Sequence, residues 1–268
     1  MDLTFGQAQV YTSEKMKGNP LAAKLFNKVF GYTNIGNYAR FTVWKKMVQM
    51  LPLSRNAKIL DLGTGYGEYA ISMATACPTS QVHALDIDQE RVKAVREAVK
   101  LYGVENITVH GDYIENIEED NFDFIFSIDV FEHIAPEQMP FKTAYNKLSE
   151  GGFFMVKIPN IEQKTIFPEK HFEEHHDWLE DEHIGQVYDL DGLKERFENE
   201  GFEIIYASYS DGWLSRLAWE LNYLAKKLST ITHVMSLPLA KGLIHLDRLL
   251  HKNKWGNAIQ VIGKKISQ

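Results

Sequence analysis

The central part of the chain alternates short apolar runs with amphipathic stretches. Amphipathic positions recur every three to four residues at about Glu68–Ala76, Gln89–Tyr102 and Pro136–Leu148, which predicts three helices. Between them, continuous apolar runs predict strands that are covered on both faces. These strands are Lys58–Leu62, Gln81–Asp86, Ile107–His110, Phe122–Ile128 and Gly152–Ile158. Strands that alternate with helices indicate a parallel sheet with crossover connections.

Helical segments flank this core on both sides. Residues 20–51 predict two helices that form an N-terminal helical cap, assigned to 1–51. Residues 52–268 form the main domain, which ends in a helix and two strands. These last elements are Asp189–Glu200, Phe202–Ser208 and Asn257–Lys264. A helical insertion at about 213–251 separates the two strands, with a break expected near Pro238. The expected fold class is α/β, with a doubly wound, mostly parallel, seven-stranded sheet.

Composition narrows the class of protein. Of 268 residues, 44% are hydrophobic and 24% charged, as in soluble globular proteins. The single cysteine, Cys77, forms no intramolecular disulfide, and residues 1–20 lack the apolar core of a signal peptide, so a cytoplasmic location is expected. The net charge of -7 argues against a nucleic-acid partner.

Charge is unevenly distributed in the C-terminal third. Residues 162–203 carry 14 Asp and Glu against 4 Lys and Arg, whereas 213–252 carry 6 Lys and Arg against 2 Asp and Glu. An apolar stripe repeats at helical spacing from Trp213 to Leu228 in the same basic segment. A basic amphipathic helix suits peripheral contact with a membrane or an amphiphilic acceptor through 213–252. The alternative is that the stripe packs on the domain itself.

A glycine-rich turn follows the first predicted strand. Gly63, Gly65 and Gly67 lie where open α/β sheets bind ligands, and glycine lets the backbone approach a nucleotide closely. A dinucleotide fingerprint requires glycine at position 68, where this chain has Glu68. A carboxylate beside a pyrophosphate is unfavourable, so a cofactor without phosphate is favoured over NAD or FAD. Asp86, at the tip of the second strand, can accept both hydroxyls of a ribose.

Several motifs in order resemble those of class I S-adenosylmethionine (SAM)-dependent methyltransferases, which have a Rossmann-like fold. The resemblance covers residues 58–160 and is nearest to the small-molecule branch of ubiquinone and menaquinone methyltransferases (methyltransferase type 11). The motifs are Asp61-Leu62-Gly63-Thr64-Gly65-Tyr66-Gly67, Asp86, Gly111-Asp112, Asp129-Val130-Phe131-Glu132-His133-Ile134 and Leu148-Ser149-Glu150-Gly151-Gly152.

This resemblance implies a role for each matching position. Asp61, Gly63 and Gly65 would hold the methionine end of SAM, and Asp86 its ribose. The remaining positions would flank the adenine or the transferable methyl group: Ile87, Asp112 and Tyr113 for adenine, and Asp129 for the methyl.

Methyl transfer requires a base only when the acceptor must lose a proton. The candidates are Glu132 and His133, one turn beyond Asp129, and His183 in the acidic segment. Each histidine is equally compatible with a packing or capping role.

Metal sites are weighed on spacing. His171 and His175 are four residues apart, but no Glu follows the first His directly, so a hydrolytic zinc site is not predicted. Asp129, Glu132 and His133 loosely resemble a magnesium-associated trio, yet three such groups beside a polar cofactor need no ion. We predict no metal.

The sequence therefore predicts a SAM-dependent methyltransferase that acts on a small-molecule or lipid- or glycan-linked acceptor. Base methylation is not favoured, because Asp129-Val130-Phe131 lacks the motif of exocyclic-amine methylation and the only cysteine, Cys77, lies at a predicted helix end rather than at a catalytic position. O- or C-methylation of the acceptor is favoured over N-methylation. A non-catalytic SAM-binding protein and a nucleotide-dependent oxidoreductase remain as alternatives.

Overall fold

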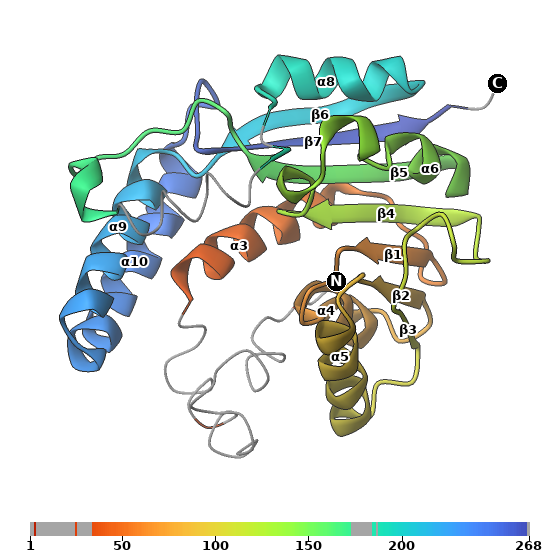
Figure 1. The fold of residues 1–268 in the computed structure, drawn as a ribbon, viewed down its shortest axis with the longest axis horizontal. Helices are drawn as coiled ribbons and strands as arrows, with labels where there is room; N and C mark the ends of the chain where they lie inside the picture. Colours follow the sequence, from red (N-terminus) through yellow and green to blue (C-terminus); the bar gives the residue numbers. More distant parts are fainter. Residues whose placement is uncertain (1–2, 4–24, 26–33, 173–183, 186, 267–268) are drawn as a thin grey trace.

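A seven-stranded sheet forms the centre of the computed structural model, which describes residues 3, 25, 34–172, 184–185 and 187–266 (Figure 1). Its strands are β1 Lys58–Leu62, β2 Gln81–Leu85, β3 Ile107–His110, β4 Phe122–Ile128, β5 Leu148–Pro159, β6 Phe202–Ser210 and β7 Ala258–Lys265. They are ordered β3–β2–β1–β4–β5–β7–β6. β7 runs antiparallel to β5 and β6, and the other paired strands are parallel. The predicted mostly parallel sheet of seven strands is confirmed.

Helices cover both faces of this sheet, as expected for a doubly wound fold. On one face lie α3 (Ile35–Met50), α4 (Glu68–Ala76) and α5 (Gln89–Tyr102), and on the other α6 (Phe141–Lys147) and α8 (Leu190–Asn199). Three short 3-10 turns complete the described core: η1 Phe131–His133, η2 Pro136–Gln138 and η3 Glu169–His171. The single helix predicted over Pro136–Leu148 is thus divided, because Pro140 removes a backbone donor between η2 and α6.

Helix α3 is part of the hydrophobic core. Asn34 caps it, because its side chain accepts a 3.1 Å hydrogen bond from the amide of Asn37. Trp44 is fully buried and packs against the rings of Tyr69 and Phe126. The first of the two helices predicted over 20–51 lies almost wholly outside the described residues.

The C-terminal insertion is a helical hairpin of α9 (Trp213–Leu228) and α10 (Thr230–Leu250), which lies beside α3 at one side of the molecule (Figure 1). The break falls at Ser229, so its prediction near Pro238 was wrong. Ser229 stops α9 and caps α10 by accepting a hydrogen bond from the amide of Thr232. Pro238 lies exposed inside α10, where water can satisfy the backbone carbonyl that loses its partner.

The topology indicates the edge of the sheet at which a ligand is expected to bind. The strand order reverses between β1 and β4, and ligands of open α/β sheets bind at the carboxyl ends of the strands beside such a reversal. The glycine turn, Asp86 and Asp129 all follow strands at this edge. Among the described helices, none combines the length and apolar character required to cross a membrane.

Candidate active site at the carboxyl edge of the sheet

The glycine turn connects β1 to α4 through backbone conformations that favour glycine. Gly63 has a φ of 80°, and a Cβ there would lie 2.5 Å from a methyl of Val130. Gly65 has a φ of 56°, but a Cβ there would meet no atom within 4 Å, so its dihedral rather than crowding selects glycine. Helix α4 begins at Glu68 directly after the turn, and its carboxylate lies at the positive end of the helix. The turn therefore presents a close backbone approach without a phosphate site.

Asp86 links this turn to the tip of β2. Its Oδ2 accepts a 2.7 Å hydrogen bond from the amide of Gly65, and its Oδ1 accepts one of 3.0 Å from the amide of Asp88. A carboxylate offers about four acceptor positions, so two remain for other donors. The pair of hydroxyls of a ribose matches this remaining capacity.

Asp61 lies buried beneath the turn. It accepts hydrogen bonds from the hydroxyl of Thr64 at 2.7 Å and the amide of Ala70 at 3.1 Å. Burial raises the pKa of Asp61 to about 7, although both hydrogen bonds oppose this shift. Asp61 thus fixes the turn against α4, and its charge depends on pH near neutrality.

The residues assigned to adenine by resemblance lie on the rim of this site. Ile87 and Tyr113 have large exposed apolar side chains, 57% and 59% exposed, beyond the ends of β2 and β3. Asp112 is engaged by the amide of Tyr113 and the side-chain amide of Asn116, both at 2.7 Å, and these bonds lower its pKa. Two exposed apolar surfaces beside hydrogen-bonding groups suit a planar, partly polar ring.

Asp129 ends β4 and lies in a chain of alternating charges. It has a φ of 52°, and its carboxylate pairs with Arg40 of α3 and, at 3.2 Å, with Lys157 of β5. Lys157 also lies 3.5 Å from Asp211, which in turn pairs with Arg248 of α10 at 2.8 Å. Neighbouring cations hold the pKa of Asp129 and of Asp211 below the usual range, despite burial. This charge chain connects α3, the sheet and the hairpin.

Glu132 is buried close to the charge chain. Burial and, to a smaller extent, the charge of Asp129 raise its pKa well above the usual range. Its Oε2 is buried and has no hydrogen-bond partner. A carboxyl group of this kind favours its protonated form, so it is better suited to donate than to accept a proton.

The two candidate histidines differ in what can be said of them. His133 is exposed at the end of η1, four residues beyond Asp129. His183, like His175 of the rejected zinc pair, lies outside the described residues. Asp129, Glu132 and His133 do not bring their ligand atoms together as a metal group within the described part of the chain.

Sequence reasoning missed four members of the charge chain, namely Arg40, Lys157, Asp211 and Arg248. Lys157 carried a usable signal, because a lysine inside the apolar strand Phe153–Ile158 is expected to have a buried partner. Arg40 and Asp211 lie in segments far apart along the chain, and nothing in their local pattern indicates that they meet at the end of β4 and β5.

Comparison with known proteins now defines the class. A family model of the methyltransferase domain matches residues 37–207. The chain also resembles ribosomal RNA small subunit methyltransferase G of Christiangramia forsetii, with 35% identity over 81 residues, or 30% of this chain and 38% of the relative. Release factor glutamine methyltransferase of Shewanella oneidensis is 39% identical over 80 residues, covering 29% of this chain and 27% of that protein. These matches thus span well under half of either relative.

Solved structures share the fold at low identity. Phosphoethanolamine N-methyltransferase 2 of Haemonchus contortus, in complex with SAM, has a TM-score of 0.62 and 19% identity, covering 97% of this chain and 60% of that chain. A SAM-dependent methyltransferase of Aquifex aeolicus has a TM-score of 0.54 and 15% identity, covering 83% and 89%. The architecture is therefore that of the Rossmann-like class I methyltransferases. This chain belongs to the methyltransferase domain family, whose model matches more than half of its length.

Proposed function

We propose that the protein transfers the methyl group of SAM to a small-molecule or lipid-linked acceptor, with residues 52–268 as the SAM-binding domain and 1–51 as its cap. The observation that carries this proposal is the pairing of Gly65 with Asp86 where the strand order reverses. It combines an open backbone turn with a carboxylate that retains acceptor capacity for a ribose. SAM fits this site, because its adenosine offers ribose hydroxyls and carries no phosphate.

Each part of the site has a role in this proposal. Gly63 and Gly65 line the methionine end with Asp61, while Asp86 receives the ribose hydroxyls. Ile87 and Tyr113 enclose the adenine, and Asp112 accepts from its amino group. Bound SAM supplies an electrophilic methyl on a sulfonium, so the chain has mainly to hold the acceptor in line.

Acceptor chemistry follows from the groups around Asp129. We assign deprotonation of an acceptor hydroxyl or carbon acid to His133, with His183 as the second candidate. Glu132, with its raised pKa, is assigned to proton donation. The resemblance to the quinone-type branch further supports a small-molecule acceptor and O- or C-methylation.

The relatives leave a different acceptor class to be tested. Those named above act, by name, on ribosomal RNA and on a release factor, but they match less than a third of this chain. Labelled SAM supplied with a cell extract, followed by separation of organic, aqueous, RNA and protein fractions, decides between them. Label in the organic or small aqueous fraction supports the proposal. Label confined to RNA or protein overturns the acceptor assignment, and SAM binding without transfer indicates a non-catalytic role.

The outer face of α10 supports a lipid-linked acceptor. Ile231, Met235, Leu239 and Leu249 recur at helical spacing and are 72%, 75%, 59% and 81% exposed. The opposite side of α10 packs inward through residues such as Ile244. The stripe noted on 213–228 is mostly half-buried, with only its end residues strongly exposed. An exposed apolar helix face of this length is typical of an interaction surface.

Charge selects the partner for this α10 face. Both acidic residues of the hairpin, Glu220 and Asp247, are buried. Glu220 accepts from the amides of Ile166 and Phe167, and Asp247 from the amides of Gly212 and Leu214 at the start of α9. The exposed charges within 213–252 are therefore basic and lie in a protein of net charge -7. A segment that carries the exposed lysines Lys226, Lys227 and Lys252 together with an apolar helix face matches an anionic lipid interface.

The hairpin also adjoins the site. Arg248 of α10 pairs with Asp211 and donates to the carbonyl of Ala39 in α3, so the base of the hairpin supplies one end of the charge chain that includes Asp129. We infer that α10 lies in the lipid interface and delivers an amphiphilic acceptor to the end of β4. This arrangement keeps the reacting group close to the membrane surface.

Vesicle sedimentation tests the membrane part separately from methyl transfer. With vesicles of phosphatidylglycerol and phosphatidylcholine, binding should require the anionic lipid and weaken with salt. Lys226→Glu/Lys227→Glu should lower the partition coefficient by roughly tenfold or more, at about 1 kcal/mol per basic residue. The matched control, Lys93→Glu/Lys100→Glu on the exposed face of α5, should bind as the unmodified protein does.

Two results would overturn membrane docking while leaving the methyltransferase assignment intact. The first is protein that stays in the supernatant with anionic vesicles at low salt. The second is a stable dimer that is lost in Met235→Glu/Leu239→Glu, because the α10 face would then be covered by a second copy of the chain.

A further inference from the structure

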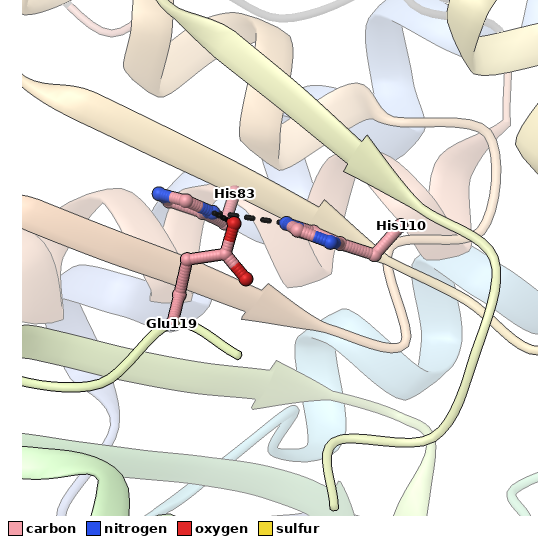
Figure 2. A group of neighbouring side chains, drawn as sticks. All are labelled: His83, His110 and Glu119. Atoms are coloured by element: carbon pink, nitrogen blue, oxygen red, sulfur yellow. Dashed lines mark hydrogen bonds and ion pairs between the residues drawn. The ribbon is translucent and has the colours of Figure 1, made fainter. Parts of the chain in front are cut away.

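A second group of polar side chains, separate from those assigned to SAM, lies on the sheet face covered by α6 and α8. His83 points from β2, His110 ends β3, and Glu119 belongs to the connection between β3 and β4 (Figure 2). One nitrogen of each histidine and a carboxylate oxygen of Glu119 all lie within 4.8 Å of one another. Three potential ligands from separate segments thus converge on one point.

The two imidazoles are held in a state that suits metal binding. Their facing nitrogens, His83 Nδ1 and His110 Nε2, are 2.9 Å apart, and the ring planes differ by only 10°. Burial lowers the pKa of both His83 and His110. One ring donates its N–H to the lone pair of the other, so the hydrogen bond already directs a coordinating nitrogen toward the point where the rings meet. A neutral imidazole nitrogen is the form that coordinates a metal ion.

The carboxylate is well placed to join them. Glu119 Oε1 lies 4.0 Å from His83 Nδ1, and the Glu119 side chain is 32% exposed, so it has room to rotate. Its backbone is fixed, because Lys147 donates to the carbonyls of Ile117 and Glu119. A fixed backbone with a movable side chain favours closure around an ion at a small loss of conformational freedom.

The charged groups near the cluster have opposite effects on a bound cation, because some are positive and one is negative. Lys58 lowers the pKa of both histidines, and Arg96 lowers that of His110, whereas Glu119 raises both. Lys58 is directed elsewhere, since its Nζ donates to the carbonyl of Asp120 and lies over the ring of Phe122. The nearby cations therefore reduce affinity without occupying the point between the three ligand atoms.

We propose that His83, His110 and Glu119 form a zinc site that fastens the 111–121 connection to the sheet. Two nitrogen ligands of a tetrahedral zinc are roughly 3.3 Å apart, given metal–nitrogen distances of about 2.0–2.1 Å, so the histidines need to separate by only a few tenths of an ångström. For both nitrogens to bind zinc, the ring that donates this hydrogen bond changes tautomer, and its proton moves to its other ring nitrogen. A water completes the four ligands. The connection also carries Asp112 and Tyr113, so the ion would stabilise one wall of the proposed adenine site.

Titration of the metal-stripped full chain with zinc chloride, in competition with a chromophoric chelator, tests the site. We expect one zinc per chain, and a Tm raised by roughly 5 °C once zinc exceeds its Kd about a hundredfold. Glu119→Gln keeps the shape but removes the charge. It should weaken binding at least tenfold and so remove about half of the Tm shift or more at the same zinc concentration. His110→Gln should have the same effect. His110 is only half-buried, so this substitution disturbs packing less than a change at the buried His83.

Matched variants separate this site from zinc held elsewhere. Glu118→Gln replaces the exposed neighbour of Glu119, and His171→Gln alters the acidic, histidine-containing segment that extends beyond residue 172. Both should bind zinc with unchanged affinity and Tm shift. The proposal is overturned if the unmodified chain takes up no zinc, or if Glu119→Gln and His110→Gln both retain full affinity. It is equally overturned if binding disappears in His171→Gln instead.

Discussion

The amide of Gly65 donates a 2.7 Å hydrogen bond to Oδ2 of Asp86, and so joins the turn after β1 to the tip of β2. The bond closes one crossover unit, because α4 and β2 lie between these residues along the chain. It orients the carboxylate before any ligand binds, which reduces the ordering that binding would otherwise require. In the proposed function, the residues that recognise the ribose are therefore the same ones that preorganise the site.

Asp86→Ala should weaken binding of SAM and S-adenosylhomocysteine by tenfold or more. The substitution removes an ionised acceptor of the ribose hydroxyls and leaves the amides of Gly65 and Asp88 without their partner. Isothermal titration calorimetry measures the effect. Glu97→Gln on the exposed face of α5 is the control and should bind SAM with unchanged affinity. Tight NADH binding without SAM binding would instead favour the oxidoreductase alternative.

Affinity for SAM should rise with pH between about 6 and 8, because the pKa of Asp61 is raised to about 7. Protonated Asp61 is neutral at the lower limit, whereas ionised Asp61 attracts the positively charged methionine end at the upper limit. The same shift gives the sign for stability. A carboxyl whose folded pKa exceeds its unfolded value stabilises the fold at low pH, and this contribution is lost as pH rises through about 7.

Asp61→Asn separates this effect from other titrations. The amide oxygen of Asn can still accept from Thr64 or Ala70, so the turn should retain its shape. Calorimetry over the same pH range should then show a much flatter dependence. An equally steep dependence in Asp61→Asn would assign the titration to another group.

Local pattern defined most of the fold but only part of the site. The core strands are continuous apolar runs, so their positions follow from composition alone, and β1, β3 and β4 have the predicted ends. The break of the hairpin was misplaced because Pro238 is the stronger helix breaker by propensity, whereas the hydroxyl of Ser229 decides the outcome by capping. A capping residue decides where a helix begins only if the chain turns there. The turn at Ser229 depends on how α9 and α10 pack, which a single sequence does not show.

Tertiary pairing explains what sequence could not reveal about the charges. Asp129 was identified from its place after β4, but its partners Arg40 and Lys157 come from α3 and β5. Glu132 is a candidate base by its sequence position alone. Its raised pKa, which favours proton donation instead, results from burial and from the charge of Asp129. Motif spacing identifies which residues reach the strand ends, while the protonation state depends on elements far away in the chain.

Lys157→Met should destabilise the protein by about 3–5 kcal/mol, because it leaves the buried carboxylates of Asp129 and Asp211 without their shared cation. The side chain of Lys157 is only 1% exposed, so water cannot replace the lost charge. Urea denaturation measures the change. Lys194→Met removes a lysine from a surface pair with Asp191 and should stay within about 0.5 kcal/mol. Equal, small effects of both variants would show that the charge chain contributes little to stability.

His133→Ala should lower turnover by roughly 10²–10⁴-fold on an acceptor that must lose a proton, the usual contribution of a general base. Its affinity for S-adenosylhomocysteine should remain within about twofold, because His133 is assigned to the acceptor and not to the cofactor. The side chain is exposed, so added imidazole can enter the space left by the substitution and should restore part of the rate. Single-turnover kinetics with labelled SAM measures all three variants: His133→Ala, His183→Ala and the double substitution. Loss of turnover only in His183→Ala transfers the role of base to that residue. Full turnover in the double variant shows that the acceptor reacts without a histidine base, and His133 is then reassigned to packing at the end of η1.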